Sequence, residues 1–263
     1  MSIENSPDKQ TRFFKYCKMS PYSVGAIKSS TLWFSTSENL NDPFDLKYTL
    51  SDELLTKTLT ESAYEMYNDL NVKMVEQGKN VLRHHFYEDM LRVFLPDQAF
   101  RDATVIMLRE TIKHSICCFT TSKDNHRMWS FYADNHKGIC LIYDFRDEPS
   151  ILNTLFPVEY SDEFPVIEKA IDIVNVGAFR KKKEWSFEKE WRLTRIDEGS
   201  ISIQPSSLKG VIFGARCSNE SIHELITECD LRNRTQIELF RMIESPLDYK
   251  LFLSPLKLDG LNL

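Results

Sequence analysis

The chain has 263 residues, of which 42% are hydrophobic and 27% charged, a composition that suits a globular protein with a substantial core. The formal net charge of -6 argues against a whole-protein nucleic-acid scaffold. No apolar stretch approaches the roughly 20 residues that span a bilayer, and the first residues lack a signal peptide's apolar core. We therefore expect a cytoplasmic protein without a membrane contact, folded as a single domain over residues 1–263 with a flexible segment at residues 1–10.

Metal and nucleotide motifs are missing from the sequence. The six cysteines are Cys17, Cys117, Cys118, Cys140, Cys217 and Cys229, and none forms a CxxC pair. We expect reduced thiols that pack as small hydrophobic side chains, and no metal site. The sequence also lacks GxGxxG, GxxxxGK[ST], HExxH and GxSxG, which argues against P-loop phosphoryl transfer and serine hydrolase chemistry.

The first third of the chain predicts two strands, Phe13–Tyr16 and Thr31–Ser35, followed by a turn-rich loop over Asn39–Phe44. The loop is expected because a residue before proline, here Asp42, avoids the helical region. Within the candidate segment Asn39–Asp45, Asn41 and Asp42 can cap turns with their side chains, and this loop could alternatively border a pocket.

A helical insertion is predicted over about 51–113. Ser51 can cap a helix whose first turn is acidic, and apolar residues then recur at helical spacing. Two further helices are expected over residues 80–95 and 97–113. Strand-like sequence on both sides indicates an insertion and not a second domain.

The rest of the chain predicts strands and short helices in irregular alternation. We expect strands at Ser115–Thr121, Ile139–Phe145, Val158–Tyr160 and Val211–Phe213, and closing strands at Ile237–Ile243 and Tyr249–Leu253. Helices are expected at Asn125–Asn135 and Pro165–Val176 and after the capping residue Ser218. Glu190–Ile196 and Ile201–Gln204 are expected to form a hairpin. This alternation favours an α+β fold with a mixed, mostly antiparallel sheet.

Two polar-aromatic segments are candidates for a site. The first segment is Asn125–Lys137. In it, Trp129 and Tyr132 share one helix face, which can serve as core or as a ligand pocket. His136 and Lys137 fall at the end of that helix, where positive charge complements the helix dipole, and they could also face a pocket mouth.

The second segment is Lys183–Arg192. In an extended chain Glu188, Glu190 and Arg192 point to the same face. This face can be an exposed surface with a charge pair, or an acidic site in which Arg192 orients one carboxylate and the other meets substrate. The preceding run Arg180–Lys183 could steer an anionic ligand, although such runs are usually solvated surface.

Taken in order, several motifs resemble an uncharacterised bacterial family of unknown function. They are Phe14-Lys15-Tyr16, the NDPF loop at Asn41–Phe44, Cys118–Thr120 with the MWxxYAxxHKG segment at Met128–Gly138, Trp185 and Glu188 with Glu190–Arg192, and Val211–Gly214. Genes similar to this family occur among mobile elements and antiviral defence loci, which implies a role as a toxin or defence effector.

A more distant similarity is to ADP-ribosyltransferase-like domains, which carry an early strand with His or Arg, a strand ending in Ser/Thr-Thr-Ser, and a late strand with Glu. The corresponding segments here are Lys15-Tyr16, Phe119–Ser122 and Glu188–Glu190. Lys15 departs from the usual His or Arg.

The similarity implies NAD as substrate and assigns roles to named residues. Glu190 or Glu188 would stabilise the ribosyl cation, and Arg192 would orient a carboxylate. Thr120 and Thr121 would contact the ribose, Tyr132 or Trp129 would stack on the base, and Lys15, Tyr16 and His136 complete the predicted NAD-binding set.

Two other functions stay open at this point. The chain could be a binding or sensor module that holds a small-molecule nucleotide with Trp129, Tyr132, His136 and Arg192. It could also be a nuclease or RNA-modifying enzyme that uses Asp42, Glu188 and Glu190 with a divalent metal.

Overall fold

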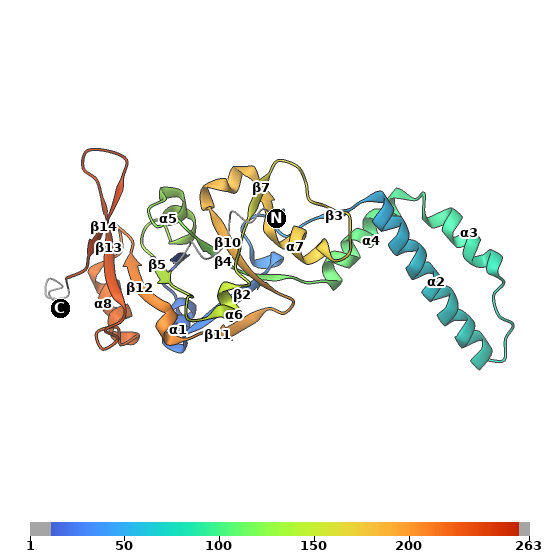
Figure 1. Cartoon of the computed structure of the whole chain (residues 1–263), viewed down its shortest axis with the longest axis horizontal. Helices are drawn as coiled ribbons and strands as arrows, with labels where there is room; N and C mark the ends of the chain where they lie inside the picture. Colours follow the sequence, from blue (N-terminus) through green and yellow to red (C-terminus); the bar gives the residue numbers. More distant parts are fainter. Residues whose placement is uncertain (1–11, 258–263) are drawn as a thin grey trace.

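The computed structural model describes residues 12–257 and has an α+β architecture with a mixed, mostly antiparallel sheet, as the sequence predicts (Figure 1). The expectation for residues 1–10 lies outside the described residues. Among the helices of residues 12–257, none has both the length and the apolar character needed to cross a membrane.

The main sheet has ten strands. These strands are β1 (Phe13–Cys17), β2 (Thr31–Thr36), β4 (Ser115–Thr120), β5 (Ile139–Tyr143), β6 (Phe156–Pro157), β10 (Glu190–Arg195), β11 (Gly199–Ser202), β12 (Leu208–Phe213), β13 (Glu238–Glu244) and β14 (Leu251–Pro255). The order is β11-β2-β4-β1-β5-β12-β13-β14, and β10 pairs with both β4 and β6. Within this sheet the β12–β13 pair is parallel.

Two small parallel sheets lie beside the main one. They pair β3 (Thr49–Leu50) with β8 (Val166–Ile167), and β7 (Glu159–Ser161) with β9 (Arg180–Lys182). The second pair matters for the site because it places Tyr160 opposite Lys181.

Strand β4 lies where the main sheet divides. One edge of β4 pairs with β10 along its whole length, from Glu190 opposite Thr120 to Arg195 opposite Ser115. The other edge is shared, because β2 pairs near Ser115 and β1 pairs at Thr120. Strands β1 and β2 therefore part from one another along the middle of β4.

Alternation along β1 places its side chains in two cores on opposite faces of the sheet. Phe13 belongs to the larger core, to which α1 (Pro21–Ser29) and α8 (Asn219–Glu228) contribute Ile27 and Ile222. Phe14 belongs to the second core, to which α5 (His126–Tyr132) contributes Trp129. The sheet is thus covered by helices on both faces.

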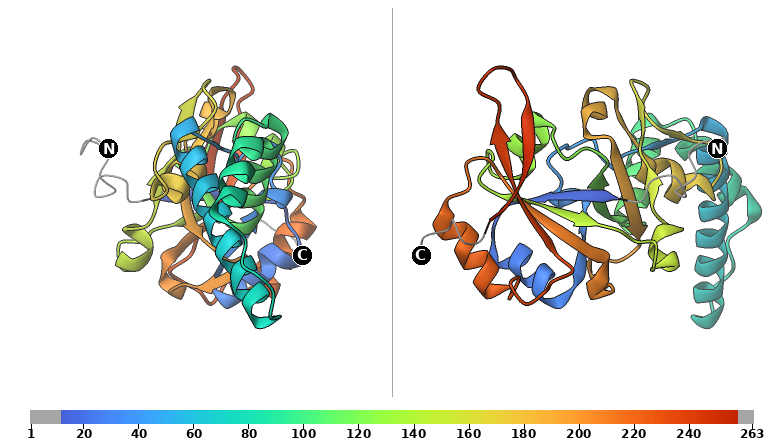
Figure 2. Two further views of the ribbon diagram at one scale, coloured as in Figure 1. Left: turned by 90° about the vertical axis from the view of Figure 1, so that its right-hand side faces the viewer. Right: turned by 60° about the vertical axis from the view of Figure 1, so that its left-hand side comes forward.

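The predicted insertion is present as three helices between β3 and β4 that form an arm at one end of the molecule (Figures 1 and 2). They are α2 (Asp52–Glu76), α3 (His84–Phe94) and α4 (Gln98–Thr111). Ser51 caps α2 by accepting a hydrogen bond from the Leu54 amide, as expected. At the base of the arm, Leu55, Leu59 and Val105 pack with Leu50 of β3 and Ile167 of β8 in a core separate from the two cores of the main sheet.

Several local predictions are wrong. Residues 165–176 do not form one helix, because Val166 and Ile167 pair with β3, and the helix there, α7 (Asp172–Phe179), begins later. Strands β10 and β11 do not form a hairpin, since β11 pairs with β2. Helix α1 was not expected, although Ser20 and Ser23 form a capping box at its start.

The remaining short elements connect the strands. They are α6 (Pro149–Leu152) and the 3₁₀ helices η3 (Ser37–Asn39), η4 (Lys183–Glu188) and η5 (Pro205–Ser207). Of these, η4 leads directly into β10 and carries one of the candidate carboxylates.

The turn between α5 and β5 is held against the end of β12. Asp134, Asn135 and His136 all adopt positive φ angles, of 46°, 53° and 72°. The His136 carbonyl accepts a hydrogen bond from the Arg216 amide at 3.0 Å, and Gly214 donates to the Gly138 carbonyl at 2.9 Å. This backbone approach leaves no room for a side chain at Gly214.

We expect Gly214→Ala to destabilise the fold by about 2 kcal/mol in urea unfolding, the usual cost of overpacking. A Cβ at this position would lie 2.1 Å from the His136 carbonyl oxygen, a backbone atom that cannot move away cheaply. The matched control is Gly25→Ala in α1, where no heavy atom lies within 4 Å of the new Cβ. The control should stabilise the protein by about 0.5–1 kcal/mol through helix propensity. Equal effects of the two substitutions would contradict this account of Gly214.

Candidate functional site

A cavity of about 180 Å³ lies beside the line along which β1 and β2 part. Much of its lining is apolar or aromatic, from Phe14, Tyr16, Phe119, Met128 and Tyr132. Charged side chains close the remainder, namely Lys15, Asp45, Lys181, Glu188 and Glu190. An apolar pocket with a few convergent polar groups is the usual form of a small-molecule site.

Arg192 organises the charged side of the cavity and has no exposed surface. Its Nε and Nη2 donate to the two Glu190 oxygens at 2.8 and 2.9 Å. Its Nη1 and Nη2 donate to the two Asp45 oxygens at 2.9 and 2.7 Å. Nη1 also donates to the Ala178 carbonyl at 2.8 Å, so all the N–H groups of the guanidinium have acceptors.

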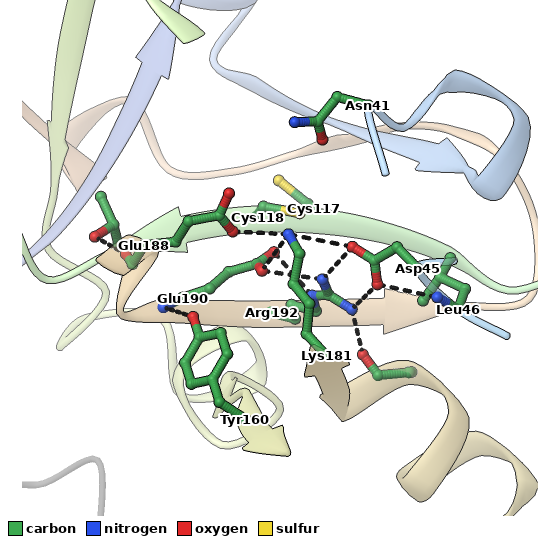
Figure 3. A network of polar contacts seen from close by, with 12 residues as sticks. Asn41, Asp45, Leu46, Cys117, Cys118, Tyr160, Lys181, Glu188, Glu190 and Arg192 are labelled. Atoms are coloured by element: carbon green, nitrogen blue, oxygen red, sulfur yellow. Dashed lines mark hydrogen bonds and ion pairs between the residues drawn. The ribbon is translucent and has the colours of Figure 1, made fainter. Parts of the chain in front are cut away.

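Lys181 is a second buried cation, which lies among three carboxylates (Figure 3). Its Nζ is 2.7 Å from Glu188 Oε2, 3.3 Å from Glu190 Oε2 and 3.3 Å from Asp45 Oδ2. Three carboxylates against Lys181 and Arg192 leave the buried network with a formal charge of −1 when all are ionised. The network by itself favours positive charge next to Glu188, and Lys15, elsewhere in the lining, offsets that charge for the cavity as a whole.

Glu188 is the carboxylate of this network that Arg192 does not bind. It accepts hydrogen bonds from Lys181 and, on its other oxygen, from the Tyr132 hydroxyl. The Tyr132 hydroxyl in turn accepts from the Asn41 amide at 3.0 Å. Asn41 belongs to the NDPF loop, so the loop and α5 together fix the direction of the Glu188 carboxylate.

The pKa values of the two glutamates are shifted in opposite directions. Burial raises the pKa of Glu188, and the neighbouring Glu190 adds to the effect, although Lys181 opposes it. Burial would also raise the pKa of Glu190, but Arg192 and Lys181 outweigh it and hold that pKa well below the usual range. Glu190 is thus a permanent anion neutralised by cations, and Glu188 is the more easily protonated group.

The backbone around Glu188 is held by β4 and β7. The Thr120 hydroxyl donates to the Glu188 carbonyl and accepts from the Ser122 amide at 3.0 Å. Lys189 adopts a left-handed conformation with φ 46°, so Glu188 does not share the regular strand of Glu190, contrary to the extended segment expected from sequence. The Glu190 amide donates to the Tyr160 hydroxyl at 2.8 Å.

The structure brings most of the predicted site residues to this cavity. Its lining includes Lys15, Tyr16, Thr120, Tyr132, Glu188 and Glu190, and Arg192 lies directly behind them. The Lys15 ammonium donates to the Cys118 carbonyl at 3.1 Å. The Tyr16 hydroxyl donates to the Ser122 carbonyl at 2.9 Å.

Three other predicted residues lie elsewhere. Trp129 has no exposed surface, and its ring packs edge-on against Tyr16 at 5.0 Å, so it belongs to the core and does not line the cavity. His136 stacks behind Trp129 at 6.2 Å. Thr121 bonds through its amide to the Lys189 carbonyl, and its side chain is absent from the cavity lining.

Sequence reasoning did not single out Lys181 or Asp45, although the segment Asn39–Asp45 does border the cavity, as one of its two interpretations predicts. Lys181 lies in a basic run for which the sequence allows either anion steering or a solvated surface, yet the middle residue of β9 is buried while its neighbours are more exposed. Side chains alternate between the two faces of a strand, so a strand over Arg180–Lys182 predicts that Lys181 points to the face opposite to that of its two neighbours. Asp45 follows the NDPF loop, and the Asp42 side chain caps that loop as expected by accepting from the Phe44 amide at 2.8 Å.

No group of three His, Cys, Asp or Glu side chains within residues 12–257 could hold a metal ion. Glu188 and Glu190 are instead occupied by Lys181, and Asp42 caps its own loop. The chemistry of this donor set is that of buried ion pairs.

These features define an α+β protein with a buried charge network beside a small aromatic cavity. Residues 128–193 match the model of a family described as a protein of unknown function (DUF2971). The likeness to a family of unknown function is therefore confirmed over a segment that contains Tyr132, Lys181, Glu188, Glu190 and Arg192. Comparisons with curated proteins and with solved structures find no significant match.

We expect Asp45→Asn to destabilise the protein by about 3 kcal/mol, because an amide N–H group replaces one of the two Asp45 oxygens and leaves a buried N–H group of Arg192 without its acceptor. The measurement is urea unfolding near neutral pH. The control is Lys182→Ala, which removes the exposed ion pair with Glu184 and should change the stability by less than about 0.5 kcal/mol. Similar losses in both variants would show that the network does not stabilise the fold through its charges.

Proposed function

We propose that the chain is an NAD-using, ADP-ribosyltransferase-like enzyme, with a cellular role as a toxin or antiviral defence effector. The observation that carries the proposal is the placement of Glu188, a carboxylate without an arginine partner, in the lining of an aromatic cavity. The resemblance in motif order adds to it. Localisation in the cytoplasm, where NAD is abundant, is part of the proposal.

The reaction breaks the glycosidic bond between the ribose C1′ and the nicotinamide nitrogen. The electron pair of that bond leaves with nicotinamide, whose ring loses its positive charge, while positive charge develops at C1′ and the ring oxygen. The acceptor, either water or a nucleophilic group of a target, then forms a bond to C1′ and releases a proton. A fixed carboxylate beside C1′ lowers the barrier by stabilising the charge that develops.

The charge of the network suits this reaction. The network at Glu188 holds three carboxylates against Lys181 and Arg192, which favours a cationic nicotinamide ring and a ribosyl cation next to Glu188, while Lys15 balances the charge of the cavity lining as a whole. Phe14, Tyr16 and Tyr132 offer aromatic surface to a flat ring.

Glu188 is the better candidate for the cation-stabilising role. Both Glu190 oxygens are bound by Arg192, and Lys181 approaches one of them, so much of its field is cancelled. Glu188 shares Lys181 with two other carboxylates and takes its second hydrogen bond from the neutral Tyr132. We assign Glu190 and Arg192 the task of positioning Lys181 and thereby Glu188.

We expect Glu188→Gln to reduce the release of nicotinamide from NAD by about 100-fold or more, because it removes the negative charge and keeps the shape. The control is Glu184→Gln, an exposed glutamate in the same 3₁₀ helix, which should retain full activity. Folding is checked by urea unfolding of both variants. Undiminished turnover in a folded Glu188→Gln protein would refute the assignment. Saturable NAD binding by the wild type without any nicotinamide release would favour the sensor function instead.

We also expect the rate to depend on pH through Glu188. The carboxylate must be ionised to stabilise a cation, and its pKa is raised from the usual 4.5, so activity should rise with pH through a midpoint above 4.5. The measurement is the pH dependence of kcat/KM for nicotinamide release. The conservative variant Glu188→Asp should keep an acid limb in whatever activity remains, and Glu188→Gln should lose that limb. An acid limb that persists in Glu188→Gln would assign it to another group.

A further inference from the structure

A second and larger cavity shares Lys15 with the cavity at Glu188 (the carboxylate cavity) but otherwise lies against the opposite face of β1, because its lining includes Cys17 whereas that of the carboxylate cavity includes Phe14 and Tyr16. This groove has a volume of about 830 Å³ and is bordered by β1, α1, β2, β5 and β11. Its volume falls within the roughly 300–1,000 Å³ typical of ligand pockets, whereas the carboxylate cavity of about 180 Å³ is too small to enclose a dinucleotide. A dinucleotide bound at Glu188 must therefore extend outside the small cavity.

Lys15 belongs to the lining of both cavities. It stands where β1 and β2 part along the middle of β4, and its ammonium bonds there to the Cys118 carbonyl. A ligand that passes from one cavity to the other meets this charge. The ammonium also donates to the Cys117 sulfur at 3.4 Å and lies 5.3 Å from the centre of the Phe119 ring, which leaves one of its three N–H groups to attract an anionic group.

The groove offers aromatic surface and positive charge. Trp33 lies on β2 between the buried Leu32 and Phe34, and 54% of its surface is exposed. Tyr22 at the start of α1 is 89% exposed. Lys18 adds a second cation to the lining, while the Glu198 carboxylate is bound by the Asn39 amide at 3.0 Å. Exposed aromatic rings next to lysines suit a base attached to phosphates.

We propose that this groove binds the nucleoside-diphosphate portion of the substrate whose reacting end lies at Glu188. The base stacks on Trp33, and the phosphates lie between Lys15 and Lys18. The inference rests on the proposed function for the identity of the reacting end, but the groove's own ligand class, an adenine nucleotide, is testable separately.

The test measures ADP binding to the full chain by titration calorimetry and by tryptophan emission. We expect ADP to bind and to quench Trp33. Trp33→Ala should weaken binding by about tenfold through lost stacking, while Trp33→Phe, which keeps an aromatic face, should retain most of the affinity. Lys18→Ala should weaken binding by about threefold, as a partly exposed charge contact does. The matched controls are Tyr249→Ala and Lys57→Ala, both exposed and outside the groove lining, and they should bind ADP like the wild type.

The outcomes separate the two proposals. Absence of ADP binding to the wild type, or equal affinities in Trp33→Ala and Tyr249→Ala, would overturn the groove assignment even if NAD is cleaved. ADP binding that depends on Trp33 and persists in Glu188→Gln supports the groove. If the wild-type protein binds ADP in this way but releases no nicotinamide from NAD, the groove stands as a nucleotide site and the enzymatic proposal fails.

Discussion

The burial of Arg192 is the constraint on which the rest of the site depends. A guanidinium without solvent contact is tolerated only if its donors and its charge are fully matched, and here two carboxylates and a carbonyl do both. Those partners come from the loop after β2, from α7 and from β10 itself. The three segments must therefore meet at one point, which fixes the wall of the cavity.

Lys181 extends the same network and gives it its chemical character. Asp45 and Glu190 form ion pairs with both Arg192 and Lys181. Lys181 also forms an ion pair with Glu188, the third carboxylate of the network. Glu188 is the carboxylate of the network that has no arginine partner. The acidities of Glu188 and Glu190 diverge for this reason, although the two residues are separated by a single position in the chain.

The division of the sheet at β4 accounts for where space is left. Because β1 and β2 bind opposite ends of one edge of β4, the sheet cannot close between them, and Lys15 satisfies the Cys118 carbonyl that lies there. Both cavities open beside this division. The helical arm, in contrast, packs through Leu55 and Leu59 against Leu50 and Ile167 in a separate core and contributes no residue to the lining of either cavity.

The sequence by itself determined the local features: the strand alternation of β1, β2 and β10, the Ser51 cap, the Asp42 turn, the α+β class, and the adjacency of Glu188, Glu190 and Arg192. These follow from contacts within a few residues. The tertiary structure decided which charges are buried. Lys181 looks like one member of a solvated basic run, and Trp129 looks as available as Tyr132, because composition and spacing do not reveal which neighbours from distant segments cover a side chain. Asp45 and Arg192 are 147 positions apart, and their pairing depends on the folding of the whole sheet between them.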